Sequence, residues 1–219
     1  MVFKALRAYD FVFSPRSSNL AQLAQLGSNT SYLPFAYNPT IHFPEAPPPD
    51  AAEKFACDIL FYGGADHDRV SYIEGLIKAQ LNVHLYGQYW ERFPLTRPAA
   101  KGMANARTLR WAITGSKVTL CLVRKANRDG HVMRTFEAPA MGACMLAEDT
   151  PEHRTILGED TVYFNSLHDM IEKTQWLVHS DTERNDLAQK TRQHILGNGN
   201  TYHHRLMAIV EHVQTYGSN

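Results

Sequence analysis

The chain has 219 residues, of which 44% are hydrophobic, and this is enough apolar surface to exclude wholesale disorder. Lysine plus arginine and aspartate plus glutamate both number 22, so the formal net charge is zero. Because nucleic-acid binders usually carry a basic excess, this balance argues against a nucleic-acid partner. The length fits one large domain, or one domain with a smaller piece attached.

The three cysteines, Cys57, Cys121 and Cys144, have no CxxC spacing. An odd number without paired spacing argues against a disulfide framework, and reduced thiols are typical of cytoplasmic proteins. No stretch approaches the roughly 18 consecutive apolar residues of a membrane span, and no signal-peptide pattern is present. The sequence therefore predicts a soluble, cytoplasmic protein without a membrane span.

The first 37 residues predict a strand-helix-strand unit. A strand is expected at 9–14, a helix at 17–26 that Gly27 ends, and a second strand at 30–35. The connection is too long for a hairpin, so the two strands are expected to be parallel. A proline-rich segment follows, with Pro34, Pro39, Pro44, Pro47, Pro48 and Pro49. We interpret 38–53 as an extended linker and place a domain boundary there.

From residue 54 onward, strands alternate with helices. Strands are predicted at 57–62, 82–86, 117–123, 143–147 and 161–164. Helices are predicted at 69–80, 105–114, 135–141, 167–179, 182–196 and from 201 to about 216. This alternation favours an α/β fold, a Rossmann-like parallel sheet with helices on both faces. We expect that domain at 54–200 and a C-terminal helix at 201–219.

In an open parallel sheet, ligands bind beyond the carboxyl ends of the strands. The first such loop carries Gly63 and Gly64, and Arg69 stands in the helix that follows. Glycines let a ligand approach the backbone, and a helix N-terminus with an arginine favours a phosphate. A plain turn is the alternative for the two glycines. The run 66–68, Asp-His-Asp, resembles a metal motif superficially, but a solvated turn is the favoured interpretation.

A second loop, 127–137, crowds charged groups behind the most apolar strand. Glu137 is expected in the first turn of a helix, where the helix dipole favours a carboxylate, so helix capping is the alternative to a binding role. A turn is the alternative for Asp129 and Gly130. In a third segment Gly142 ends a short helix, and a helix C-cap is its alternative.

The run from Asp129 to Glu148, DGHVMRTFEAPAMGACMLAE, resembles the donor-domain signature of the CgeB-like group of group-1-type glycosyltransferases. These enzymes have the GT-B architecture, in which two Rossmann-like domains face each other. Other segments agree in order and spacing, namely 58–64 with Arg69, 83–87 with Trp90, 160–167 and 201–205. The resemblance covers roughly residues 54–213. It implies that this region binds a nucleotide-diphosphate sugar, as the C-terminal domain of that fold does, without a metal or other cofactor.

The resemblance also implies roles for individual residues. Retaining members carry two acidic residues with seven between them, the first near the transferred sugar and the second on the ribose hydroxyls. Glu137 matches the second and Asp129 matches the first, as Asp in place of Glu, which shortens the side chain. The residues expected to line the nucleotide-sugar site are Gly63, Gly64, Arg69, Gly87, His131, Arg134, Glu137 and Gly142. Arg69 and Arg134 are expected to stabilise the charge that grows on the departing diphosphate.

The GT-B architecture implies a second, acceptor-binding domain, and residues 1–37 resemble only its last β-α-β piece. A lone unit of this kind cannot bury both faces of its strands. We therefore expect an exposed apolar surface formed by Phe11, Val12, Phe13, Leu33 and Phe35. This surface predicts a homodimer, or a partner subunit, that associates through residues 1–37.

Three functional hypotheses follow. The first is a glycosyltransferase, or its donor-binding module, that transfers a sugar from a nucleotide sugar to an unknown acceptor. The second is a non-catalytic nucleotide-sugar binder that needs a partner acceptor domain, because the acceptor half is short and Asp129 departs from the pattern. The third is a flavodoxin-like or regulator-type domain, which predicts neither the pair of acidic residues nor the late helix. The sugar, the base and the acceptor stay open.

Overall fold

The computed structural model describes residues 5–6, 8–26, 29–127 and 129–217. The N-terminal unit, residues 5–37, contains β1 (Phe11–Ser14), the 3-10 helix η1 (Ser17–Asn19), α2 (Leu20–Ala24) and β2 (Asn29–Tyr32). The two strands pair in parallel, with Phe11 opposite Asn29 and Ser14 opposite Tyr32. The predicted parallel strand-helix-strand unit is confirmed, and the predicted helix end at Gly27 lies outside the described residues.

A second sheet forms the main body of the molecule. Its strands are β3 (Cys57–Tyr62), β4 (Val83–Tyr86), β5 (Ser116–Cys121), β6 (Met145–Glu148) and β7 (Val162–Phe164). Their order is β4-β3-β5-β6-β7, and every neighbouring pair is parallel. The predicted α/β fold with a parallel sheet is therefore confirmed.

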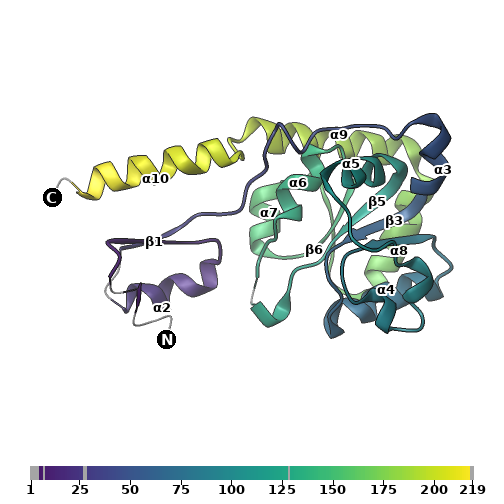
Figure 1. Cartoon of the computed structure of the whole chain (residues 1–219), viewed down its shortest axis with the longest axis horizontal. Helices are drawn as coiled ribbons and strands as arrows, with labels where there is room; N and C mark the ends of the chain where they lie inside the picture. Colours follow the sequence, from purple (N-terminus) through teal and green to yellow (C-terminus); the bar gives the residue numbers. More distant parts are fainter. Residues whose placement is uncertain (1–4, 7, 27–28, 128, 218–219) are drawn as a thin grey trace.

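Helices cover both faces of this sheet (Figure 1). They are α3 (Ala52–Phe55), α4 (His67–Lys78), α5 (Ala106–Gly115), α6 (Arg134–Ala140), α7 (Pro151–Leu157), α8 (Leu167–His179), α9 (Asp181–Gly197) and α10 (Tyr202–Gly217). Short 3-10 helices are η2 (Pro49–Ala51), η3 (Trp90–Arg92), η4 (Arg97–Ala99) and η5 (Lys125–Asn127). The contacts place α4 and α8 on one face and α5, α6 and α7 on the other. Helix α7 was not expected from the sequence pattern.

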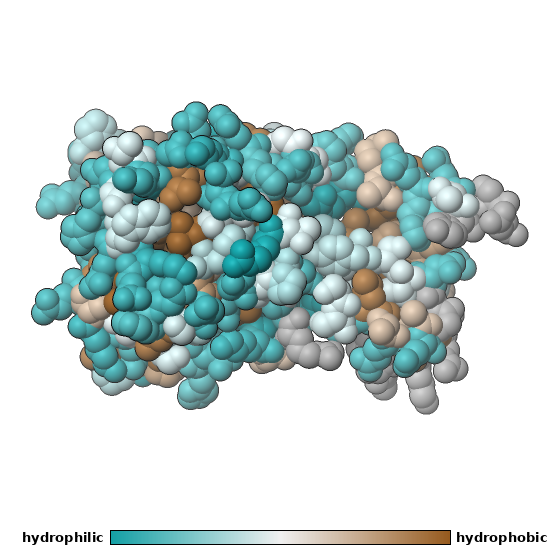
Figure 2. All heavy atoms as spheres, turned by 180° about the vertical axis from the view of Figure 1, so that it is seen from behind, coloured by the Kyte–Doolittle hydropathy of each residue, from teal (hydrophilic) through white to brown (hydrophobic). Residues whose placement is uncertain are grey.

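The strands are apolar on both sides because both faces are covered. In β3, Ile59 and Phe61 pack into the core on the α4 and α8 face, while Leu60 and Tyr62 pack on the opposite face. The outer surface is different in character. Figure 2 shows a largely hydrophilic face on which hydrophobic residues form separate small patches. Within the described residues, none of the helices combines the length and apolar character needed to cross a membrane.

The proline-rich segment has little regular structure, as predicted, but it is held firmly against α5. Arg110 donates from Nη1 to the Ile41 carbonyl at 2.9 Å and from Nε to the Glu45 carboxylate at 2.6 Å. Thr114 donates to the Glu45 carbonyl at 3.0 Å. These contacts fix residues 41–45 on the main body, so this segment is a structural part of it rather than a free linker.

Helix α10 follows α9 along the top of Figure 1 and reaches over the N-terminal unit. The rings of Phe11 and Phe13 each meet the His212 ring of α10 at a centroid distance of 5.4 Å. Arg205 at the start of α10 donates to the carbonyls of Pro34 and Phe35 at 3.0–3.2 Å. The expectation of an exposed apolar surface is thereby corrected, because α10 covers part of it and its five side chains are half-buried.

Candidate functional site

The carboxyl ends of β3 and β4 lie so close together that only glycine fits between them. Gly63 and Gly87 have φ of +150° and +135°, a region that L-residues avoid. A Cβ on Gly87 would lie 2.3 Å from the Gly63 carbonyl oxygen. Trp90 donates its indole N–H to that same oxygen at 2.7 Å. The two strand ends therefore form one rigid, side-chain-free wall.

Two buried guanidinium groups lie beside this wall. Arg134, the first residue of α6, sits 4.4 Å from the centre of the Phe61 ring, and its Nη2 donates to the Tyr62 carbonyl. Arg69 in α4 donates from Nη1 to the Gly64 carbonyl at 3.2 Å and lies 5.6 Å from the Phe61 ring. The two residues are 7% and 6% exposed. Burial, followed by the Arg134 charge, lowers the pKa of Arg69 from its usual value.

Both arginines keep donors that no protein group accepts. Among the described residues, Arg69 Nε and Arg134 Nε and Nη1 are buried without a hydrogen-bond partner, and so is the Tyr62 hydroxyl. Buried polar groups are nearly always hydrogen-bonded in folded proteins, so each exception needs an explanation. Guanidinium donors match the oxygens of a phosphate or carboxylate. The unused donors therefore indicate an anionic ligand.

Seven of the nine predicted site residues line two cavities that share Tyr62 and Arg124 in their walls. One cavity, of about 390 Å³, is lined by Arg69, Asp129, Arg134 and Glu137. The other, of about 560 Å³, is lined by Gly63, Gly64 and Gly87. The structure thus brings together residues that are up to 74 positions apart in the sequence, from Gly63 to Glu137.

Arg124 belongs to this site, although the sequence analysis did not single it out. It comes directly after the apolar run that includes β5, and its Nε lies 3.4 Å from Asp66 Oδ2. Asp66 also caps α4, since its Oδ1 accepts from the Arg69 backbone N–H at 3.0 Å. The carboxylate is therefore held between the helix end and two arginines. The sequence did offer a signal for Arg124, namely a cationic residue directly after a buried strand.

Glu137 projects into the smaller cavity from the first turn of α6. Its side chain is 13% exposed, and its Oε1 lies 3.7 Å from Nε2 of His42 in the proline-rich segment. Burial raises the pKa of Glu137, and the nearby Arg134 charge opposes that rise. A residue that only capped the helix would not need this burial, because a surface carboxylate at a helix N-terminus also gains a favourable dipole interaction.

Asp129 lies on the same cavity wall but is already engaged. Its carboxylate pairs with the Arg16 side chain of the N-terminal unit. Asn127 donates to its other oxygen at 3.4 Å. The side chain of Asp129 is 8% exposed. The N-terminal unit therefore reaches the site directly and fixes one of its two predicted acidic residues.

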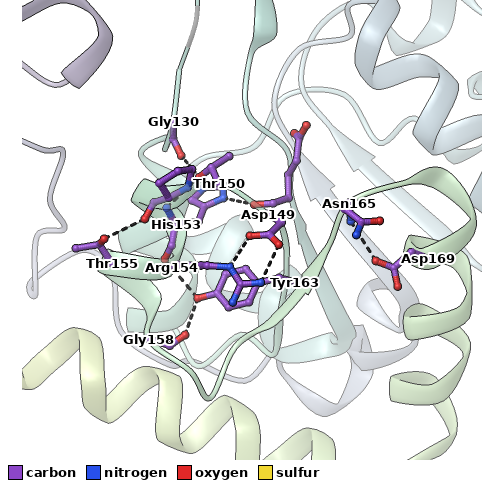
Figure 3. Close-up of polar contacts among 12 residues, drawn as sticks. Gly130, Asp149, Thr150, His153, Arg154, Thr155, Gly158, Tyr163, Asn165 and Asp169 are labelled. Carbon is purple, nitrogen blue, oxygen red and sulfur yellow. Dashed lines mark hydrogen bonds and ion pairs between the residues drawn. The ribbon is translucent and has the colours of Figure 1, made fainter.

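Helix α7 holds the loop that carries Asp129 (Figure 3). The Thr150 hydroxyl donates to the Gly130 carbonyl and accepts from the His153 backbone N–H at 3.0 Å, which caps α7. A Cβ on Gly130 would overlap the carboxylate of Glu152, so the loop lies directly against this helix. An element that the sequence analysis missed thus positions the loop.

Two predicted residues lie elsewhere. His131 is 1% exposed, its Nε2 accepts from the Phe35 backbone N–H at 3.2 Å, and its Nδ1 lies 3.3 Å from the Tyr32 hydroxyl. Burial lowers its pKa to about 4. The ring joins the main body to the N-terminal unit and lines neither cavity, which corrects its expected place in the donor site.

Gly142 is the second correction. It lies between α6 and β6, and it lines a separate cavity together with Ser116, the first residue of β5. That is the amino-terminal edge of the parallel sheet, opposite the edge where Gly63 and Gly87 lie. Its φ is +91°, and Ala143 donates back to the Ala138 carbonyl at 3.1 Å. The helix C-cap interpretation therefore describes Gly142.

Comparison with known proteins gives a family and a fold. A family model described as glycosyl transferase-like matches residues 69–211. No curated protein matches the sequence significantly. The match includes Arg69, Arg124, Arg134, Asp129 and Glu137.

Three solved structures are similar in fold. A sucrose-phosphate synthase from Thermosynechococcus elongatus has a TM-score of 0.69 at 14% identity, over 100% of this chain and 61% of that one. Anabaena Alr3699/HepE in complex with UDP-glucose has a TM-score of 0.71 at 8% identity, over 98% and 68%. A T4 phage BGT mutant in complex with UDP-glucose has a TM-score of 0.61 at 17% identity, over 85% and 57%. This chain thus spans less than two thirds of the first and third chains.

The close approach of the β3 and β4 ends predicts that a glycine-to-alanine substitution destabilises the fold more at Gly87 than at Gly102. Gly87→Ala combines a forbidden φ with a clash against Gly63, and we expect it to cost about 3 kcal/mol or more of unfolding free energy. Gly102→Ala is the control, since Gly102 has φ +77° and an added Cβ would meet nothing within 4 Å. We expect about 1 kcal/mol there. Equal losses in urea unfolding would contradict the close approach.

The buried Glu137 predicts a pH-dependent stability difference. A carboxyl group with a raised pKa in the folded chain ionises first in the unfolded chain, so ionisation destabilises the fold as pH rises above its usual value of 4.5. Glu137→Gln cannot ionise. We expect its melting temperature, relative to wild type, to rise between pH 4 and pH 7.5. Glu172→Gln, on an exposed side chain of α8, is the control. A pH-independent difference would refute the assignment.

Proposed function

We propose that this chain, which belongs to the glycosyl transferase-like family, binds a nucleoside-diphosphate sugar at the carboxyl edge of its five-stranded sheet and transfers the sugar to an acceptor. The observation that carries this proposal is the set of unused donors on Arg69 and Arg134. A diphosphate supplies the anionic oxygens that these donors lack. The edge is also the one where open parallel sheets bind ligands.

Each part of the nucleotide sugar has a matching group. We assign the diphosphate to Arg69 and Arg134, and the ribose hydroxyls to the Glu137 carboxylate, which accepts hydrogen bonds from adjacent hydroxyls. The larger cavity beside Gly63 and Gly87 offers space for the base. Because two proteins of similar fold were solved with UDP-glucose, a uridine nucleotide is the first donor to test.

The chemistry requires charge stabilisation more than covalent help. Negative charge grows on the diphosphate as the bond to the sugar breaks. The two guanidinium groups are buried and fixed beforehand, so they stabilise that charge more strongly than they would in water. Asp129 lies on the same cavity wall, and we propose that the transferred sugar binds near it. We propose a hexosyl transfer with retention, and the finer likeness to the CgeB-like group rests on residues 129–148.

A non-catalytic nucleotide-sugar binder is the second candidate. One observation favours it: the Asp129 carboxylate is already paired with Arg16. Such a protein binds the donor but leaves catalysis to a partner that supplies acceptor-binding surface. Turnover therefore separates the two candidates, while binding alone does not.

A panel of UDP-, GDP- and ADP-sugars tests the proposal. We expect one nucleotide to raise the melting temperature, by an amount equivalent to about 2.7 kcal/mol at one hundred times Kd. Glu137→Gln should weaken that binding roughly 10- to 100-fold, the range for a hydrogen bond to a charged group, while the exposed control Glu172→Gln should not. Slow donor hydrolysis indicates the transferase, and binding without turnover indicates the second candidate. No shift with any nucleotide would reject both.

We also propose a division of the chain into an N-terminal unit (1–37), a linker that is held against the main body through Ile41 and Glu45 (38–53), a nucleotide-sugar domain (54–200) and a C-terminal helix (201–219). The three cysteines are free and buried, which supports a reducing compartment such as the cytoplasm.

Association through residues 1–37, with a second copy or a partner subunit, completes the proposal. In the described residues, β1 and β2 form a sheet of only two strands, and α10 covers only part of its apolar side chains, so a partner could cover the rest. We expect sedimentation equilibrium to give twice the 24.8 kDa mass of one chain as concentration rises. A single-chain mass at every concentration would contradict the homodimer.

A further inference from the structure

His42 lies in the proline-rich segment, where no sequence motif marks it, and its imidazole meets the Glu137 carboxylate. The distance from Nε2 to Oε1 is 3.7 Å, and the two side chains are 15% and 13% exposed. The segment is held against α5, because Arg110 donates hydrogen bonds to the Ile41 carbonyl and the Glu45 carboxylate on either side of His42. The contact is therefore a fixed feature of the fold.

A hydrogen bond within the segment determines which nitrogen of the His42 imidazole carries the proton. The Asn38 backbone N–H donates to Nδ1 of His42 at 3.0 Å, so Nδ1 is the acceptor. In the neutral ring the proton then resides on Nε2, the nitrogen nearest the carboxylate. Burial, followed by the Arg110 charge, lowers the pKa of His42, which favours the neutral ring that an accepting Nδ1 requires. Nε2 thus presents an N–H to Glu137.

We propose that His42 is a positioning residue, which orients the Glu137 carboxylate toward the ribose hydroxyls of the nucleotide sugar. This inference rests on the proposed function, since it concerns the residue assigned to the ribose. At 3.7 Å the unliganded contact is longer than a hydrogen bond, and contacts of this kind often tighten only when the ligand is bound. A donor on one carboxylate oxygen limits rotation of the group and leaves the other for the ligand.

The surroundings of the pair agree with this role. Arg134 and Arg110 are the cations that act on Glu137 and His42, respectively. Burial raises the pKa of Tyr202 in α10, and the nearby Glu137 charge raises it further. Packing alone does not account for the burial of Glu137 and His42, because the Nε2 edge of the imidazole faces the carboxylate. The proline-rich segment therefore contributes a residue to the donor site.

Two substitutions separate positioning from local structure. His42→Asn places an amide oxygen near the position of Nδ1, so it preserves the acceptor for the Asn38 N–H and removes the donor to Glu137. His42→Gln places an amide N–H near the position of Nε2, so it preserves the donor to Glu137 and removes the acceptor. We expect UDP to bind His42→Asn roughly tenfold more weakly than wild type, and His42→Gln nearly as tightly as wild type. Thermal unfolding reports stability separately, and there we expect the opposite ranking.

A double-mutant cycle completes the experiment. In the Glu137→Gln background, His42→Asn should have little further effect on the Kd for UDP, because the carboxylate that it positions is gone. Equal binding by wild type and His42→Asn, or equal losses in both backgrounds, would overturn the role of His42. If wild-type protein binds neither UDP nor another nucleotide of the panel, the proposed function fails instead, and the two failures are distinguishable.

Discussion

The site depends on two positive charges that are buried side by side. Arg69 and Arg134 both lie against the Phe61 ring at the end of β3, and both are more than nine-tenths buried. Burying like charges together is unfavourable unless anions compensate them. Asp66 lies 3.6 Å from Arg69 and offsets part of the charge, yet three guanidinium nitrogens stay unpaired among the described residues. The wall formed by Gly63 and Gly87, the capped helix α4 and the charged loop after β5 surround these nitrogens.

Segments outside the main sheet also contact the residues of the site. The N-terminal unit reaches Asp129 through Arg16 and holds the His131 ring through Phe35. The proline-rich segment brings His42 to Glu137. Helix α10 binds the end of the N-terminal unit through Arg205. Segments distant in sequence therefore meet around the smaller cavity, and a change in the N-terminal unit is expected to reach this cavity through Arg16 and Phe35.

The sequence predicted the elements better than the contacts. Largely apolar runs such as 57–62 and 117–123 could be assigned as buried strands, because both faces of a parallel sheet are covered. Gly63 and Gly87 could be placed in the site because strand ends meet at one edge of a sheet. Helix α7 was missed, although Thr150 and Pro151 form a helix start, because its seven residues are too short for a periodic apolar pattern.

Contacts that join distant segments were beyond the sequence pattern. His131 stands among charged residues, so it was expected in the site, but its neighbours Tyr32 and Phe35 come from a segment about 100 positions earlier. Gly142 has the same local signal as a ligand-binding glycine, yet its place before a strand puts it at the opposite edge of the sheet. His42 carried no signal, because its role arises only when the proline-rich segment folds back onto α6.

A crystal structure of the protein with bound UDP tests the central claim most directly. We expect diphosphate oxygens within hydrogen-bond distance of Arg69 Nε and of Arg134 Nε or Nη1, and ribose hydroxyls that donate to the Glu137 carboxylate. A diphosphate bound elsewhere, with these guanidinium donors still unpaired, would contradict it.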